Sequence, residues 1–94
     1  MKITGIIWLE DIVEKIARKH NVRDYEIVEV LQESPYFRFV EKGYQRDEDL
    51  YAALGRTDSG RYLIIFFIYK TDRNALIVSA RDMTRTERRK YERR

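Results

Sequence analysis

Three arginines and one histidine have types and positions that suit chemistry on a phosphate group. Arg56, Arg61 and Arg81 stand at the ends of predicted strands, and His20 is the only histidine of the chain. Guanidinium groups bind phosphate oxygens through paired N–H donors and stay charged. Histidine is the side-chain type that most readily exchanges protons near neutral pH. The set is consistent with a site that binds a phosphate and moves a proton.

A plainer interpretation of each residue stays open. Strand-end arginines are often solvated or paired with a nearby carboxylate, here Asp58 or Asp82. His20 lies four residues after Ile16, at the edge of a predicted apolar helix face. In that position it could cap the helix or be half-buried.

The composition excludes several classes of site. There is no cysteine, so disulfides, thiolate chemistry and cysteine-based zinc sites are excluded. A metal site would depend almost wholly on carboxylates, and no suitable cluster is evident, so we expect no metal and no cofactor. The longest apolar run, 62–69, is far shorter than the roughly twenty residues of a membrane helix. We expect one soluble, cytoplasmic domain over residues 1–94, with no membrane partner.

Apolar residues three and four positions apart predict two N-terminal helices. The first covers 9–20 and ends at Asn21, a residue type that accepts the left-handed conformation. The second covers 23–34, with Asp24 as its N-cap. It ends before Pro35, because the residue preceding a proline avoids helical backbone angles.

The spacing then changes to the alternation typical of strands. Turn sequences separate the expected strands, which follow a short N-terminal strand and cover 36–43, 49–56, 61–70 and 75–81. This order predicts a small α+β domain with two N-terminal helices, an antiparallel meander sheet and a C-terminal helix.

A meander would bring the arginines together, because alternate strands run in the same direction. Arg56 and Arg81 should finish at one end of the sheet, on either side of the strand that Arg61 begins. Neighbouring strands lie about 4.8 Å apart, so the Cα atoms of Arg56 and Arg81 should be roughly 10 Å apart. From that distance two arginine side chains can converge on one phosphate.

The C-terminal segment is strongly basic, since seven of the fourteen residues from Arg81 to Arg94 are Arg or Lys. It is either a loose hook for an anionic partner or an ordered helix. Thr84 and Glu87 fit the S/T-x-x-E capping box, in which each side chain satisfies the other's backbone N–H. The capping box favours an ordered helix from Thr84 onward.

The strand over 61–70 is apolar on both faces. Two amphipathic helices can cover one face, whereas a short C-terminal helix covers only part of the other. Exposed apolar surface usually marks an interface, so we expect a stable complex with a second chain.

Three stretches resemble the BrnT family of toxin–antitoxin ribonucleases, which have a RelE-like fold. The stretch RKHNV at 18–22 is similar to the family's Lys-His-Gly-Val. The stretch ALGRTDSGRYLIIFFIY at 53–69 is similar to its Ala-Leu-Gly-Arg segment, turn and long apolar strand. The stretch LIVSARDMTRTERRKYE at 76–92 is similar to its Ile-Ser-Ala-Arg strand and the following helix, and is the most specific of the three.

The resemblance implies a metal-independent endoribonuclease toxin that cleaves RNA by attack of a 2′-hydroxyl on the adjacent phosphate. It also implies a cognate BrnA-type antitoxin of the ribbon-helix-helix class, with DNA bound only through the toxin–antitoxin complex. A homodimer is also open. By matching position, the resemblance assigns catalysis to His20, Arg56 and Arg81. The expected substrate-binding residues are Lys15, Arg61 and Arg85.

The chain departs from the family pattern around the first helix. The family usually has Trp-Asp near the start, then a lysine and an asparagine, where this chain has Leu9, Ile12 and Ile16. Lys15 lies one turn beyond the replaced lysine and is a candidate substitute. Two alternatives to an active ribonuclease therefore stay open. One is a weak or inactive BrnT-like protein that acts as a repression partner, and the other is a small nucleic-acid-binding module.

Overall fold

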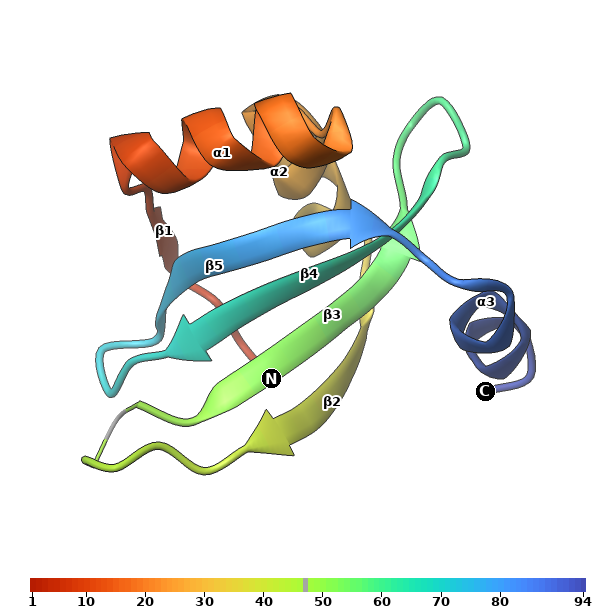
Figure 1. Ribbon diagram of the computed structural model, residues 1–94. Coiled ribbons are helices and arrows are strands. Elements are labelled where there is room, and N and C mark those ends of the chain that lie inside the picture. Colours follow the sequence, from red (N-terminus) through yellow and green to blue (C-terminus); the bar gives the residue numbers. More distant parts are fainter. Residues whose placement is uncertain (47) are drawn as a thin grey trace.

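The computed structural model describes residues 1–46 and 48–94, which form three helices and five strands. In chain order the elements are β1 (Gly5–Ile7), α1 (Glu10–His20), α2 (Asp24–Gln32), β2 (Tyr36–Glu41), β3 (Leu50–Arg56), β4 (Tyr62–Tyr69), β5 (Asn74–Asp82) and α3 (Arg85–Glu92) (Figure 1). Every element expected from the sequence is present, and the bounds differ by at most two residues.

The five strands form one sheet in the order β1-β5-β4-β3-β2. Strands β2 to β5 form the expected antiparallel meander, in which β4 pairs with both β3 and β5. The short strand β1 pairs with β5 in the parallel direction, from Gly5 opposite Asn74 to Ile7 opposite Leu76. The sheet is therefore mixed, and the predicted α+β class is confirmed.

Apolar side chains of α1 and α2 form the larger core with one face of the sheet. Ile16 of α1 and Ile27 and Val30 of α2 are buried in one cluster, together with the β4 residues Leu63 and Phe67. Each helix therefore buries one side, which is why its apolar residues recur at helical spacing.

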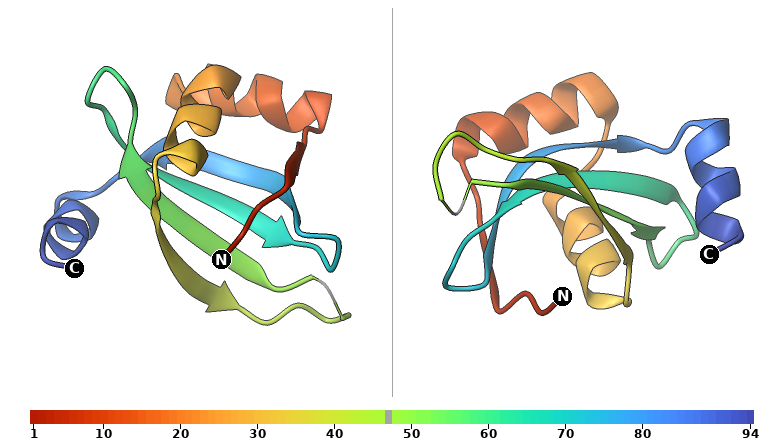
Figure 2. Two further views of the ribbon diagram at one scale, coloured as in Figure 1. Left: turned by 180° about the vertical axis from the view of Figure 1, so that it is seen from behind. Right: turned by 90° about the horizontal axis from the view of Figure 1, so that it is seen from below.

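Helix α3 packs on the opposite face of the sheet, near one end. Its Tyr91 is buried in a second cluster with Leu54 and Ile64. Both views in Figure 2 show α3 standing apart from α1 and α2. Beyond α3, Phe66 and Ile68 on this face stay half-exposed. The expectation that the C-terminal helix covers only part of this face is confirmed.

The helix ends follow the sequence with one exception. Asn21 ends α1 in the left-handed conformation, with φ 54° and ψ 38°, as predicted. The prediction that Asp24 is the N-cap of α2 is wrong, because Arg23 occupies that position. The carboxylate of Glu26 accepts the backbone N–H of Arg23 at 3.0 Å and so caps the helix from its first turn. Within the described residues, no helix has the length and apolar character to cross a membrane.

Candidate functional site

Arg56 and Arg81 lie at the same end and on the same face of the sheet. Arg56 is opposite Tyr62 in the β3–β4 pair, and Arg81 is opposite Ile64 in the β4–β5 pair. Tyr62 and Ile64 share one face of β4, because side chains alternate along a strand. In Figure 1 the arrowheads of β3 and β5 both point toward the α3 end. The expected meeting of the two strand ends is confirmed, on the face that α3 partly covers.

A β-bulge in β5 decides which face Arg81 occupies. The register of the β4–β5 pair shifts between Phe66 and Phe67, whose partners are Ser79 and Ile77, so β5 contains one extra residue. An extra residue reverses the alternation of side chains in the rest of the strand. Arg81 consequently faces α3.

The guanidinium of Arg81 is held by both α3 and the sheet. Its two terminal nitrogens donate to the carboxylate of Glu87 at 2.8 and 3.0 Å, and one of them also donates to the backbone carbonyl of Asp82 at 3.1 Å. Its carbon Cζ lies 5.5 Å from the centre of the Phe66 ring. The hydrogen bonds from Arg81 lower the pKa of Glu87 to about 2. The pair is therefore ionised on both sides at neutral pH.

Glu87 also caps α3. Its carboxylate accepts the backbone N–H of Thr84 at 2.8 Å, and the hydroxyl of Thr84 accepts the backbone N–H of Glu87 at 3.1 Å. The predicted capping box is confirmed. Because Tyr91 anchors the other end of the helix in the second core cluster, the C-terminal segment is a docked helix and not a loose hook.

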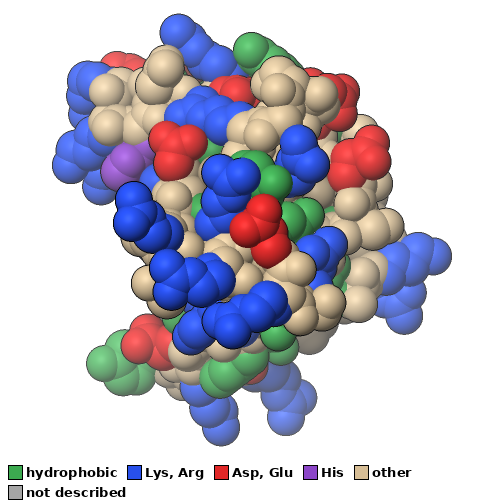
Figure 3. Space-filling model, turned by 90° about the vertical axis from the view of Figure 1, so that its right-hand side faces the viewer, with side chains coloured by type: hydrophobic (Ala, Val, Ile, Leu, Met, Phe, Trp, Pro, Cys, Tyr) green, Lys and Arg blue, Asp and Glu red, His purple; other side chains and the backbone are tan. Residues whose placement is uncertain are grey.

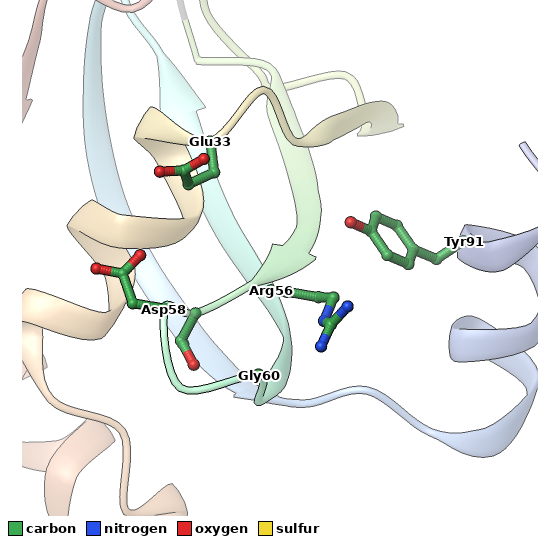
Figure 4. Close-up of a pocket in the computed structure, with 6 residues that line it drawn as sticks. Glu33, Arg56, Asp58, Gly60 and Tyr91 are labelled. Carbon is green, nitrogen blue, oxygen red and sulfur yellow. The ribbon is translucent and has the colours of Figure 1, made fainter.

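Arg56 is exposed beside an open pocket. Its Cζ lies 4.9 Å from the centre of the Tyr62 ring, and within residues 1–46 and 48–94 its guanidinium makes no hydrogen bond or ion pair. Figure 4 shows this guanidinium pointing across a gap toward Tyr91, while the carboxylates of Asp58 and Glu33 point away from it. The pocket has a volume of about 470 Å³ and is lined by Glu33, Arg56, Thr57, Asp58, Gly60 and Tyr91.

Arg61 uses all five N–H donors of its guanidinium inside the fold. Nε and Nη2 donate to the carboxylate of Asp82 at 2.8 and 3.1 Å. Nη1 donates to the carbonyl of Asn21 at 2.7 Å and to the carboxylate of Glu26 at 3.2 Å. Nη2 also donates to the carbonyl of His20 at 3.1 Å. Arg61 thus fixes the end of α1 to the sheet, and this geometry leaves no donor for a substrate phosphate.

His20 ends α1 at the same end of the sheet and is half-buried. The pKa of Asp82 is lowered, chiefly by the hydrogen bond from Arg61 and least by the charge of His20. The carbonyl of Asp82 accepts a hydrogen bond from Arg81. In the described part of the chain no hydrogen bond joins the imidazole to Arg56 or Arg81. Asp82 therefore connects the end of α1, through Arg61, to Arg81.

Lys15 and Arg85 are both exposed cations. Lys15 lies in the middle of α1, and Arg85 is the first residue of α3. Neither side chain makes an ion pair or hydrogen bond within the residues that the structure describes. Figure 3 shows Lys and Arg side chains gathered on the face at the α3 end of the molecule, with the single histidine at the border of this basic face.

Sequence reasoning gave no site role to Tyr62, Phe66 or Arg88. The ring of Tyr62 lies under two guanidinium groups, since the Cζ atom of Arg88 is 3.9 Å from its centre and that of Arg56 is 4.9 Å away. The alternation within β4 already places Tyr62 and Phe66 on one face. The alternation does not show which face of the sheet the basic helix α3 covers, so the sequence pattern alone could not assign Tyr62 and Phe66 to the site.

Metal-ligating side chains do not gather at this end of the sheet. No group of three or more His, Asp or Glu residues in the described ranges is placed to hold a metal ion. The polar groups of the site are mainly arginine N–H donors, and the carboxylates of Glu87 and Asp82 are committed to Arg81 and Arg61.

Comparison with known proteins identifies the family. A comparison with individually curated proteins gave no match. The family described as "Ribonuclease toxin, BrnT, of type II toxin-antitoxin system" matches residues 8–87. This span covers most of the chain and contains His20, Arg56 and Arg81. RNA as the target and a cognate antitoxin as the partner follow from the family. The chain therefore belongs to the BrnT family of ribonuclease toxins of type II toxin–antitoxin systems.

Proposed function

We propose that this chain is a metal-independent endoribonuclease that cleaves RNA by attack of a 2′-hydroxyl on the adjacent phosphate. The observation that carries the proposal is the placement of Arg56 and Arg81 at one end and on one face of the sheet. Two guanidinium groups in this position can hold a phosphodiester and the extra negative charge that develops as the 2′-oxygen attacks.

The two arginines differ in how many of their N–H donors the protein already binds. Arg56 has no protein partner for its N–H donors in the described residues, so all of them are open to a phosphate. Arg81 is held in place by Glu87, and its Nε and one terminal N–H have no partner in the same residues. A guanidinium that is already fixed stabilises developing charge without reorganising during the reaction.

Cleavage also requires two proton transfers. The 2′-hydroxyl loses a proton as it attacks, and the leaving 5′-oxygen gains one. We assign proton transfer to His20, whose backbone is held by Arg61. Because Asp82 connects the end of α1, through Arg61, to Arg81, an RNA strand that reaches both His20 and Arg81 would cross the end of β5. Glu87, with a pKa of about 2, is too weak a base for this step near neutral pH.

The substrate-binding residues have unequal support. Arg85 is exposed at the first position of α3, two residues before Glu87, and we propose that it contacts a flanking phosphate. Lys15 is exposed on α1 and stays a candidate for the opposite side of His20. Arg61 would act through His20, by fixing the end of α1, and not by touching RNA.

We also propose that a BrnA-type antitoxin of the ribbon-helix-helix class neutralises the enzyme, and that DNA is contacted only through that complex. The apolar side chains that α3 leaves half-exposed, Phe66 and Ile68, support an interface on this face. A homodimer through the same surface is the alternative arrangement, and the mass of the purified complex with and without the antitoxin separates the two.

The deciding experiment treats a short RNA with the purified protein in EDTA. Cleavage should leave a 2′,3′-cyclic phosphate and a 5′-hydroxyl, and an RNA with 2′-O-methyl groups throughout should stay intact. His20→Gln and Arg56→Ala should each remove most of the activity. Loss of cleavage in EDTA that Mg²⁺ restores would refute the metal-independent mechanism.

A weak or inactive BrnT protein is the second candidate, and one observation favours it. Ile16 is only 3% exposed in the larger core cluster, and Ile12 packs against that cluster. If these positions correspond to the family's lysine and asparagine, they serve packing in this chain. No cleavage under any condition, ribosomes included, together with retained antitoxin binding, would support this candidate.

A further inference from the structure

We propose that the face of the molecule bearing α3 carries a phosphate track, formed by Arg81, Arg56, Arg88 and Arg94, that binds the backbone of single-stranded RNA beside the cleaved bond. The choice of RNA as the ligand rests on the proposed function. The track itself rests on contacts among these arginines and the aromatic rings beneath them, and it can be tested without any cleavage.

Each arginine of the phosphate track lies over an aromatic ring. The distances from Cζ to the ring centre are 5.5 Å for Arg81 over Phe66, 4.9 Å for Arg56 over Tyr62, 3.9 Å for Arg88 over Tyr62 and 3.9 Å for Arg94 over Tyr91. A planar guanidinium stacks favourably on an aromatic ring, and the ammonium group of lysine does not stack in this way. Stacking therefore holds these long side chains in place and lowers the entropy lost when they bind a ligand.

The rings are spread along one face of β4 and onto α3. Tyr62 and Phe66 share one face of β4 and are four residues apart, which is roughly 13 Å along the strand. The rings of Tyr62 and Tyr91 meet edge to face with centres 6.0 Å apart, which continues the support from the sheet onto α3. Figure 3 shows the blue side chains gathered on this side of the molecule. The track is long enough to meet more than one phosphate.

The contacts point to phosphates and not to bases. A stacked guanidinium uses its flat face on the protein ring and keeps its N–H edge for an oxyanion. In proteins that bind single strands, aromatic rings usually stack on the bases. The ring of Tyr62 is already stacked by Arg56 and Arg88, so it is not open to a base. Binding along the phosphate track should therefore depend on salt and be tolerant of sequence.

The neighbouring carboxylates are already engaged by the protein. Glu87 is paired with Arg81. Glu92 accepts the hydroxyl of Tyr62 at 3.4 Å and lies 3.6 Å from Nε of Arg88. Because Glu92 touches one edge of Arg88 only, the other N–H donors of that guanidinium have no partner among the described residues.

The test measures binding of a labelled oligodeoxythymidylate, which this mechanism cannot cleave, at several KCl concentrations. Arg88→Ala should weaken binding about tenfold at low salt. It should also reduce the slope of log K against log salt by about 0.7, the value for one lost phosphate contact in a single strand. Arg88→Lys keeps the charge, so the slope should hold while the affinity falls.

Arg18→Ala is the matched control. Arg18 and Glu14 form an exposed pair four residues apart on α1 at 3.7 Å, much as Arg88 and Glu92 do on α3 at 3.6 Å. Both variants lose one positive charge and one ion pair, but only Arg88 stacks on a ring of the track. The control should leave the affinity within about twofold of wild type. Equal effects of the two variants would overturn the phosphate track in favour of general charge attraction.

A second probe separates phosphates from bases. An oligomer of the same length that lacks bases should compete within about twofold of oligodeoxythymidylate, whereas failure to compete would overturn phosphate recognition. No binding of either oligomer at low salt would also overturn it and would leave an acidic protein segment as the ligand of this face. Binding without RNA cleavage would sustain the track and remove the proposed ribonuclease. Cleavage with unaltered binding by Arg88→Ala would remove the track alone.

Discussion

Arg81 and Glu87 form a two-point ion pair across the turn between β5 and α3, with N–O distances of 2.8 and 3.0 Å. The same carboxylate accepts the backbone N–H of Thr84. One carboxylate thus links a proposed catalytic arginine to the cap of the C-terminal helix. Changes that loosen the helix start should also loosen the arginine.

Glu87→Gln should alter the acid stability of the fold. The pKa of Glu87 falls from 4.5 to about 2, so its contribution is complete above pH 4.5 and is lost as the pH falls toward 2. The contribution at pH 7 is at most about 3 kcal/mol. Thermal melts between pH 2 and pH 7 should show a lower and flatter profile for the variant. Parallel profiles for the two proteins would contradict the ion pair.

Thr84→Ala should cost about 1 kcal/mol of unfolding free energy, the usual effect of losing an N-cap. Thr86→Ala, an exposed position in the same helix turn, is the control and should change stability by less than about 0.5 kcal/mol. Urea denaturation measures both. Because Arg81 is tied to the same carboxylate, Thr84→Ala should also lower RNA cleavage, and equal stability of the two variants would argue against the capping box.

Arg56→Ala should lower RNA cleavage about 100-fold or more, the range for removing one donor to a developing oxyanion. The melting temperature should change little, because Arg56 is exposed and has no hydrogen bond or ion pair in the described ranges. Single-turnover cleavage and thermal melts measure the two effects, with Arg18→Ala as the charge-matched control. Wild-type cleavage by Arg56→Ala would exclude this arginine from the site.

Gly60→Ala should disturb Arg56 from the neighbouring turn. Gly60 has φ 93°, which costs a residue with a Cβ about 1 kcal/mol or more, and that Cβ would lie 3.2 Å from Nη2 of Arg56. Cleavage should fall together with stability. In the Gly60→Ala/Arg56→Ala double variant, cleavage should be no lower than in Arg56→Ala alone. Additive losses would show that Gly60 acts on another part of the site.

Arg61→Ala should destabilise the fold by about 3 kcal/mol, because Glu26 is only 8% exposed and would keep its charge without a guanidinium partner. Adding Glu26→Gln should recover part of this loss, because the buried charge is then removed. Urea denaturation of Arg61→Ala, Glu26→Gln and the double variant gives the coupling free energy between the two residues. A mild effect of Arg61→Ala would count against its role in fixing the end of α1.

The sequence predicted the elements and the strand ends better than the contacts between them. Helical spacing, the Thr84–Glu87 box and the apolar run of β4 are local signals, and each predicted its element correctly. The parallel pairing of β1 with β5 depends on residues about seventy positions apart, which no local pattern records. The Arg61–Glu26 contact is also a tertiary contact and was not predicted, whereas pairing of a strand-end arginine with Asp82 was an alternative that the sequence left open.

The candidate site was harder to predict than the fold for a related reason. That Arg56 and Arg81 share one end of the sheet follows from the meander alone. Which residues face one another there depends on the sheet face to which each side chain points. The bulge in β5 changes that face, and the period-two pattern of the sequence does not show where it falls.

The bulge also decides which changes in length β5 can accept. Val78 lies between the residues paired with Phe67 and Phe66, so deleting it would remove the bulge and leave Arg81 opposite Ile64. Inserting one residue between Val78 and Arg81 would instead put the end of β5 out of phase. Arg81 would then point toward α1, and Asp82 toward α3. The composition and net charge of the chain would hardly change, yet the Arg81 guanidinium would lie on the face of the sheet opposite α3. Insertions in the gene should therefore be accepted in the turns that flank β5 and rejected between Val78 and Arg81, whereas loss of Val78 should be accepted.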